Sequence, residues 1–281
     1  MSKQNALARL RKSSLVRDDT TDPNGRIYRD SQGNIYHSVT RILSATAPAE
    51  QKAALERWLE RPTAAEDRDM AATRGTLAHN HAEYLLKTGA KIARQTANKR
   101  RCWKTSADGL ERCPGSITRW GLERAIQGAP RVPWSAAGYA RGLRCWIADH
   151  VTAIHAIEFS THHPGGWAGT TDALLDIQGT GPVVVDWKTS VRERSEEMLT
   201  NYVDQCGAYS LGLKHLTGIK PVGAFIVVAR RTGAPQIRQL SELELLGAES
   251  RFADRAARYF EEQKSHSQGS LRSHEKSHSQ G

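Results

Sequence analysis

The fold of this 281-residue chain is decided by residues 169–188, Gly169-Thr-Thr-Asp172-Ala-Leu-Leu-Asp-Ile-Gln-Gly-Thr-Gly-Pro-Val-Val-Val-Asp186-Trp-Lys188. The turn residues Gln178-Gly-Thr-Gly181 separate two apolar runs, which predicts two antiparallel strands joined by a tight turn. In a symmetric hairpin Asp172 lies opposite Asp186, and side-chain alternation puts Lys188 on the face of Asp186. The sequence therefore predicts two acids and a lysine at one end of a sheet.

Two opposed carboxylates in such a hairpin need compensation. Like charges destabilise a sheet, and the run of valines at 183–185 predicts a strand that is buried on both faces. A divalent cation such as Mg²⁺ compensates both acids, because it prefers carboxylate oxygens, and it also binds substrate phosphate. Lys188 would then lie near that phosphate and support the attacking water or the transition-state charge. The alternative is a salt bridge at a strand end.

Periodicity around the hairpin predicts a mixed α/β core. Three strands, at 153–160, 168–177 and 182–187, are expected to form an antiparallel meander with helices packed on the sheet. Further downstream we expect a helix over 196–216, strands over 222–229 and 236–240, and a helix over 243–263. Upstream we expect a hairpin over 26–36, then a short helix capped by Ser38 or Thr40, and a second short helix that begins after Pro48. A long helix over 63–87 that ends at Gly89 and a helix over 136–151 are expected to follow.

The positive charge of the chain is concentrated in two segments. There are 40 Lys and Arg against 30 Asp and Glu, which gives +10. Residues 1–17 hold five basic residues and no acid, and residues 89–134 hold ten basic and three acidic residues, so the remainder carries −2. Either these segments are solvated, or they track the phosphates of a nucleic acid. The densest basic cluster is Lys99, Arg100 and Arg101.

Three tryptophans, Trp103, Trp120 and Trp134, are interleaved with the arginines of 89–134. This pattern suits stacking on single strands, although tryptophan is also ordinary packing material. We expect a basic flexible arm at 1–25, one folded domain at 26–263 with an irregular basic insertion at about 89–134, and a disordered tail at 264–281. No run approaches the roughly 18 apolar residues of a membrane span, and the N-terminus lacks the apolar core of a secretory signal.

Asp172 followed by Asp186-Trp187-Lys188 resembles the core motif of the PD-(D/E)xK nucleases. Glu158 lies on the strand before, as the first acidic motif of that family does. The run Gly75-Thr-Leu-Ala-His79 resembles the G-x-x-x-H helix motif of RecB-type nucleases, whose histidine joins the metal site. The resemblance implies a restriction-endonuclease-like α/β fold with a mixed sheet.

Further motifs extend the resemblance over about residues 26–260, apart from the basic insertion. Gln205-Cys-Gly-Ala-Tyr209 resembles the Q-x-x-x-Y motif on the helix after the lysine. Segments 36–43 and 55–58 are similar to the N-terminal pattern of the branch that contains the mitochondrial genome maintenance exonuclease and related phage exonucleases. His37 stands where that branch usually has proline, which should alter only the local turn.

The resemblance implies Mg²⁺ or Mn²⁺ held by Asp172, Asp186 and the backbone carbonyl of Trp187. Glu158 is expected as a further ligand or as a base that positions water, and its alternative is a surface acid. His79 has the motif spacing for the metal site. His81, two residues on, points about 200° around the helix.

Gln205 and Tyr209 are four residues apart and share a helix face. They could hold a DNA phosphate or stack on a base. The alternative is that Tyr209 packs in the core beside Tyr202 and Leu213.

The cysteines depart from the pattern of those RecB-type relatives that carry an iron–sulfur cluster, which have three cysteines grouped near the C-terminus. Cys102, Cys113, Cys145 and Cys206 are scattered, and none follows Cys206. We therefore expect no iron–sulfur cluster. The first three could in principle hold zinc, but their spacing fits no standard finger, so ordinary thiols are favoured.

The residues and the resemblance together predict a metal-dependent DNA exonuclease that hydrolyses phosphodiester bonds. The resemblance implies a role in DNA recombination, repair or replication-end processing, for example as a phage exonuclease paired with a single-strand annealing protein. The alternatives are a structure-specific endonuclease on the same core and a non-catalytic DNA-binding accessory protein. We expect a cytoplasmic location in a bacterium or phage-infected host rather than a mitochondrial one, although the acid-free basic N-terminus resembles a short transit peptide.

Overall fold

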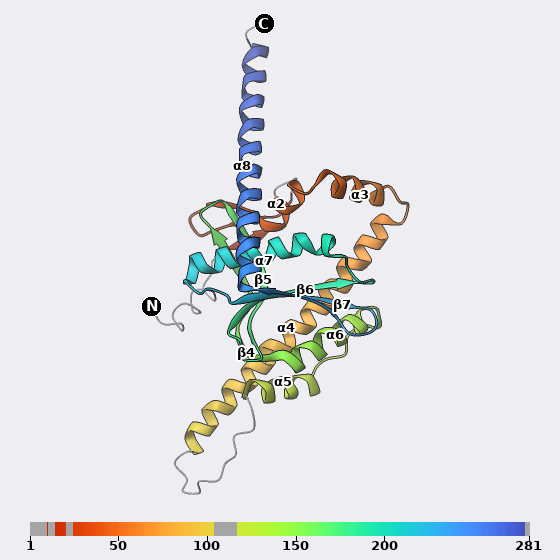
Figure 1. The fold of residues 1–281 in the computed structure, drawn as a ribbon, viewed down its shortest axis with the longest axis vertical. Helices are drawn as coiled ribbons and strands as arrows, with labels where there is room; N and C mark the ends of the chain where they lie inside the picture. The colour runs from red at the N-terminus through yellow and green to blue at the C-terminus, as the bar shows by residue number, and fades with distance from the viewer. Residues whose placement is uncertain (1–9, 11–14, 21–24, 104–116, 279–281) are drawn as a thin grey trace.

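The computed structural model describes Leu10 and residues 15–20, 25–103 and 117–278; within these ranges, the side chains of 98–103, 117 and 266–278 are not described. Figure 1 shows a central sheet with helices on both faces. The strands are β1 Val16–Asp18, β2 Ile27–Arg29, β3 Ile35–Ser38, β4 Val151–His163, β5 Trp167–Ile177, β6 Pro182–Ser190, β7 Gly223–Arg230 and β8 Gln236–Ser241. The helices are α2 Val39–Ala45, α3 Ala49–Leu59, α4 Ala64–Trp103, α5 Ile117–Gln127, α6 Trp134–His150, α7 Glu196–Thr217 and α8 Glu242–His278.

The predicted meander β4–β5–β6 is confirmed. Strand β5 pairs antiparallel with β4 on one edge and with β6 on the other, and its register with β6 includes Leu174 opposite Val184, as the symmetric hairpin predicts. The sheet is mixed, because β6 pairs parallel with β7 and β3 pairs parallel with β5. Its order is β1-β2-β3-β5-β6-β7-β8, with β4 on the other edge of β5.

Alternating residues of β6 feed two separate cores, which confirms that this strand is buried on both faces. Val184 packs with α2, α7 and α8 on one face of the sheet. Val183 and Val185 pack with α4, α5 and α6 on the other face. The result is a three-layer α/β/α arrangement that fixes the end of β6, and therefore Asp186 and Lys188, in the middle of the molecule.

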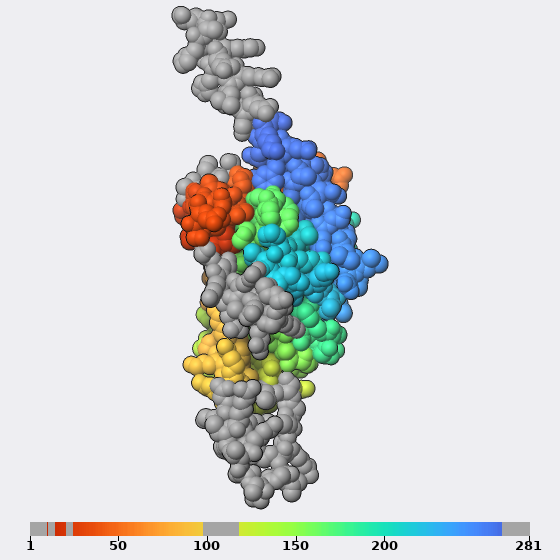
Figure 2. Space-filling model, turned by 90° about the vertical axis from the view of Figure 1, so that its left-hand side faces the viewer, coloured from red at the N-terminus to blue at the C-terminus, as the bar shows by residue number. Residues whose placement is uncertain are grey.

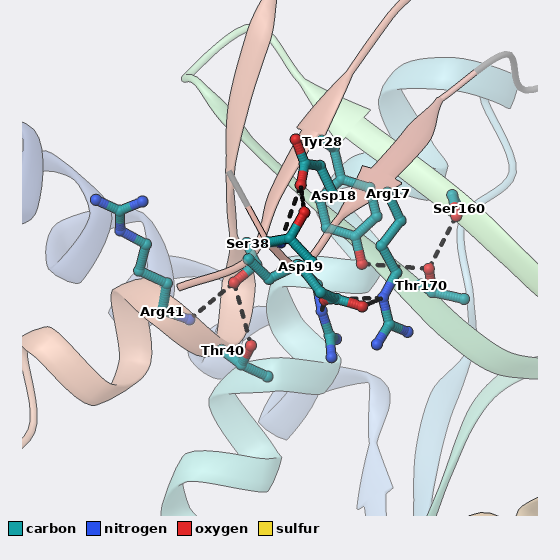
Figure 3. Close-up of polar contacts among 11 residues, drawn as sticks. Arg17, Asp18, Asp19, Tyr28, Ser38, Thr40, Arg41, Ser160 and Thr170 are labelled. Atoms are coloured by element: carbon teal, nitrogen blue, oxygen red, sulfur yellow. Dashed lines mark hydrogen bonds and ion pairs between the residues drawn. The ribbon is translucent and has the colours of Figure 1, made fainter. Parts of the chain in front are cut away.

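The N-terminal strands attach to the meander through polar contacts. The Tyr28 hydroxyl lies 3.3 Å from the Thr170 hydroxyl, which lies 2.9 Å from that of Ser160, so that β2, β5 and β4 are linked (Figure 3). The Ser38 hydroxyl accepts a hydrogen bond from the Arg41 backbone N–H and caps α2, as expected. Strand β1 lies within the segment that we expected to be a flexible arm, where Val16 pairs with Arg29 of the adjacent β2.

The prediction that Gly89 ends the long helix is wrong. Helix α4 continues to Trp103, and α5 packs against it at two glycines. A Cβ atom on Gly121 would lie 2.3 Å from the Gly89 carbonyl oxygen, and one on Gly89 would lie 2.8 Å from Leu122. Gly89 therefore allows two helices to approach closely rather than ending one of them. Within the expected irregular insertion, residues 89–103 and 117–127 are helical, whereas the described residues 128–133 are not.

Helix α8 also differs from the expectation. It begins at Glu242 and continues to His278, whereas we expected regular structure to end at Gln263. In Figure 1 the far part of α8 extends from one end of the molecule and α4 reaches the opposite end. In Figure 2 the coloured part of α8 (blue) lies in the upper half of the molecule, and the gold part of α4 lies in the lower half. Among the described residues, no helix combines the length and the apolar character that a membrane crossing requires.

Candidate active site

The site lies where β5 and β6 separate. Their pairing includes Ala173 opposite Val185 and extends from there toward the turn, so that Asp172 is the first residue beyond the paired region. The Asp172 carboxylate fills the opening and accepts a hydrogen bond of 2.6 Å from the Trp187 backbone N–H. This bond satisfies a backbone donor that would otherwise lack a partner, and it fixes one carboxylate at the end of the sheet.

Glu158 comes to the same place from the other neighbour of β5. Ile157 pairs with Ala173 and Phe159 pairs with Thr171, which puts Glu158 beside Asp172. The φ angle of Glu158 is +46°, an unusual backbone conformation for a residue other than glycine and one that is often found at functional sites. Burial and the nearby charges of Asp172 and Glu83 raise the pKa of Glu158 to about 7.

His79 completes a cluster of three possible ligands. Its Nδ1 lies 3.5 Å from Asp172 Oδ1, and one ligand atom each of His79, Glu158 and Asp172 lies within 4.8 Å of the others. Burial alone would lower the pKa of His79, but the hydrogen bond and charge of Asp172 outweigh it and raise this pKa. His81 is buried elsewhere, with only 8% of its surface exposed, and it takes no part in the cluster.

Asp186 and Lys188 form an ion pair next to this cluster. Lys188 Nζ lies 2.6 Å from Asp186 Oδ2 and 4.9 Å from the centre of the Tyr202 ring, and the Asp186 side chain is almost fully buried. Burial alone would lower the pKa of Lys188, but the charges of Asp186 and Asp172 raise it, so the ammonium stays protonated. From the sequence, Tyr202 is expected only as a core neighbour of Tyr209, whereas its cation–π contact with Lys188 places it beside the site.

Gln205 and Tyr209 do not face solvent. Gln205 donates a hydrogen bond of 2.5 Å from its side-chain amide to the Tyr209 hydroxyl, and only 6% and 5% of their surfaces are exposed. The Tyr209 ring packs so closely on Gly169 that a Cβ atom there would lie 2.6 Å from it. This burial favours the packing interpretation for Tyr209, which shares its core with Leu213.

Two hollows flank the site. One has a volume of about 630 Å³ and is lined by β4 from Ile154 to Ser160, including Glu158, together with Lys87 and Arg94 of α4. The other has a volume of about 1270 Å³ and lies between α3, the start of α4 and the segment after β6, with four arginines in its lining: Arg68, Arg74, Arg192 and Arg194. Four acidic residues, Glu50, Asp67, Glu193 and Glu197, line the same hollow, so it offers both signs of charge to a polyanion that crosses the site.

Other predicted residues are placed only in part. The cluster Lys99, Arg100 and Arg101 lies on α4, but its side chains are outside the described residues, as is that of Cys102; Cys113 lies wholly outside them. Cys206 is buried in the core, and burial raises the pKa of its thiol, whereas Cys145 is exposed on α6. Trp187 is buried in the core between the sheet and helices α4, α5 and α6, and its backbone N–H donates a hydrogen bond to Asp172.

The arrangement fits a hard divalent cation. Carboxylate oxygens are suitable donors for Mg²⁺ or Mn²⁺, and the imidazole of His79 adds a nitrogen donor of the kind that transition metals prefer. Three acids on adjacent strands, Glu158, Asp172 and Asp186, meet one lysine and one histidine, and mutual repulsion and burial raise the pKa of Glu158. A bound cation would relieve that repulsion.

The mixed α/β fold, with Asp172, Asp186 and Lys188 at the end of its sheet, defines a class of nuclease in which two acids and a lysine form the site. The family model of the PD-(D/E)XK nuclease superfamily matches residues 7–274, so the chain belongs to that superfamily. This confirms the resemblance noted in the sequence and the mixed α/β core, and it is consistent with the RecB-type branch. Members of this superfamily use divalent metal ions.

Comparisons with individual proteins add little. No curated protein matches the sequence significantly. Among solved structures, a crystal structure of a protein from Eubacterium rectale that is provisionally described as an exonuclease is similar over 53% of this chain and 67% of that one, with 15% identity and a TM-score of 0.33. A likeness at this level carries no argument about function.

Proposed function

We propose that this protein is a metal-dependent DNA exonuclease. The observation that carries the proposal is the convergence of Asp172, Glu158 and His79 beside the buried Asp186–Lys188 pair. A protein that only bound DNA would have no need for three carboxylates around one lysine, because carboxylates repel phosphate.

The residues have distinct roles in the proposed reaction. Asp172, His79 and Asp186 would hold a divalent cation, which when bound would supply neutralisation of phosphate charge and an acidified water. The protonated Lys188 ammonium stabilises the negative charge that develops on the phosphate oxygens. Glu158 is either a further ligand of the cation or the base that accepts a proton from the attacking water. The Trp187 backbone N–H keeps Asp172 in position.

The two flanking hollows give the substrate a path. A strand that passes from Lys87 and Arg94, across Glu158, toward Arg74 and Arg194 meets basic side chains before and after the acids. The proposed role in recombination, repair or replication-end processing, and the proposed single-strand annealing partner, rest on the family resemblance of the sequence.

End-labelled linear DNA and a covalently closed single-stranded circle test the proposal with Mg²⁺ and with EDTA. An exonuclease degrades the linear DNA progressively from an end and leaves the circle intact, because the circle offers no end. Cleavage of the circle would replace the proposal with the endonuclease alternative. The absence of metal-dependent cleavage on any of these substrates would contradict both.

A further inference from the structure

A third hollow lies away from the acids and is strongly basic. Its volume is about 590 Å³, and its lining comes from five segments: α4, the end of α5, the connection from α5 to α6, the first turns of α6 and the turn between β7 and β8. We call it the basic pocket and define it by six of its lining residues, His81, Arg131, Trp134, Arg141, Arg144 and Arg231.

The basic pocket is separate from the active site. His81 lies two residues after His79 on α4, which turns its side chain by about 200° around the helix. His79 therefore faces Asp172, whereas His81 lines the basic pocket on another side of α4.

The pocket wall is fixed by close backbone packing. A Cβ atom on Gly138 would lie only 1.9 Å from the Arg231 carbonyl oxygen. This contact holds the β7–β8 turn against α6, so Arg231 and the start of α6 face the same space.

Positive charge in the pocket is not neutralised by neighbouring acids. No Asp or Glu belongs to the lining, and within the described part of the chain none of the four arginines forms an ion pair. Four guanidinium groups around one cavity repel each other, and an anion removes that repulsion.

Two further groups offer donors to an anion. His81 has 92% of its surface buried, and no hydrogen-bond partner of its ring is found among the described residues. Helix α6, which has 17 residues, begins at Trp134 after Pro133, and no side chain caps its N-terminus. Free backbone N–H groups at a helix N-terminus favour negative charge.

Trp134 provides a surface for a base. It is 84% exposed, which is unusual for a tryptophan, and the Arg231 guanidinium lies 5.6 Å from the centre of its ring. Aromatic rings next to arginines stack on bases, and a base is available for stacking only where the strand is not paired.

We infer that the basic pocket binds single-stranded nucleic acid outside the active site. The arginines and His81 hold phosphates, and Trp134 stacks on one base. The inference rests on the proposed function, and it names single strands as the form of substrate that the protein holds while cutting.

Binding of a fluorescent single-stranded oligonucleotide of thymidines in EDTA tests the pocket without cleavage. Trp134→Ala is expected to raise Kd about 5- to 150-fold, which corresponds to the loss of one base stack, and Trp134→Phe should restore most of the affinity. The triple variant Arg131→Gln, Arg144→Gln, Arg231→Gln should lower the salt slope of log Kd by about two, since each single-strand phosphate contact contributes about 0.7. The matched control is Arg258→Gln, an exposed arginine on α8, which should change neither value.

Unchanged Kd in Trp134→Ala together with an unchanged slope in the triple variant would overturn the inference. The inference would also be overturned if the wild type bound poly-glutamate and the triple variant lost this binding but kept its affinity for the oligonucleotide. An acidic protein would then be the ligand of the pocket. Circular dichroism checks that each variant is folded. The two proposals fail separately. If the wild type cleaves DNA and the pocket variants bind single strands normally, only this inference fails. If the pocket variants bind single strands weakly and the wild type cleaves no DNA, only the proposed nuclease activity fails.

Discussion

Two histidines of helix α4, only two residues apart, lie in opposite electrical surroundings. His79 meets Asp172 and lies near Glu158, in a cluster where the nearby acids raise the histidine pKa. His81 lines a cavity with four arginines, where burial and the charge of Arg144 lower its pKa.

In the two proposals, one helix serves both the metal site and the binding of the strand. The side of α4 that faces the sheet end gathers carboxylates, which suit a cation. The side that faces α6 gathers guanidinium groups, which suit phosphates. The two residues are of the same type, so their different surroundings come from the helix. Its rotation of about 100° per residue puts their side chains on different sides of α4.

The largest expected effect is on the acidic side. Lys188→Ala should lower the cleavage rate by at least about 10²–10³-fold, because it removes the ammonium that stabilises transition-state charge. It should also lower the free energy of unfolding by about 3 kcal/mol, because it leaves Asp186 buried without its partner. Steady-state kinetics and urea unfolding measure the two effects.

A double variant separates chemistry from folding. Adding Asp186→Asn to Lys188→Ala should restore part of the stability, since no buried charge is left unpaired, but no cleavage. Restored cleavage in this variant would show that the single variant was inactive only because it was destabilised.

The two histidines can be compared directly. His79→Ala should raise the Mg²⁺ concentration at half-maximal rate about 10- to 100-fold, because it removes one donor from the cluster. His81→Gln should leave that concentration unchanged and weaken single-strand binding in EDTA instead. Equal metal requirements in the two variants would mean that the two sides of α4 do not differ in function.

The close approach of α4 and α5 is a smaller target. Gly121→Val should lower the free energy of unfolding by about 1–3 kcal/mol, because its side chain meets the Gly89 carbonyl. Gly128→Ala is the matched control. A Cβ atom on Gly128 would lie 3.6 Å from the Arg124 carbonyl oxygen, which is an ordinary van der Waals distance. Chemical denaturation measures both, and similar losses would contradict the close crossing.

The smallest expected effect concerns the cluster Lys99, Arg100 and Arg101. Replacing all three by glutamine should flatten the salt dependence of DNA binding, with a change in slope of up to about two for single strands. A titration of affinity against salt measures it. An unchanged slope would mean that these residues are solvated and do not contact DNA phosphates. The basic pocket would then be the remaining proposed contact with the nucleic acid.

The meander could be predicted because its signals are local. The turn at 178–181 and the alternation on either side set the register that places Asp172 and Asp186, and β5 and β6 form as expected. The helix start at Ser38 was predictable for the same reason, since a cap is formed by neighbouring residues.

Features that depend on distant packing were not predictable. Gly89 has the composition of a helix end, but its role is set by Gly121 and Leu122, which lie more than 30 residues away. The positive φ of Glu158 carries no sequence signal. The basic pocket combines Arg131 and Trp134 of the predicted basic segment with Arg141, Arg144 and Arg231, which lie outside it, so charge runs alone did not reveal it.

The most direct test of the central claim is the cleavage of end-labelled linear DNA by wild type and Asp186→Asn, followed over time with Mg²⁺, with DNA binding measured in parallel. The account predicts that the wild type shortens the DNA only when metal is present, and that the variant binds DNA with similar affinity but does not cut it. Cleavage by Asp186→Asn at close to the wild-type rate would contradict the assignment of the acids and Lys188 as the catalytic site.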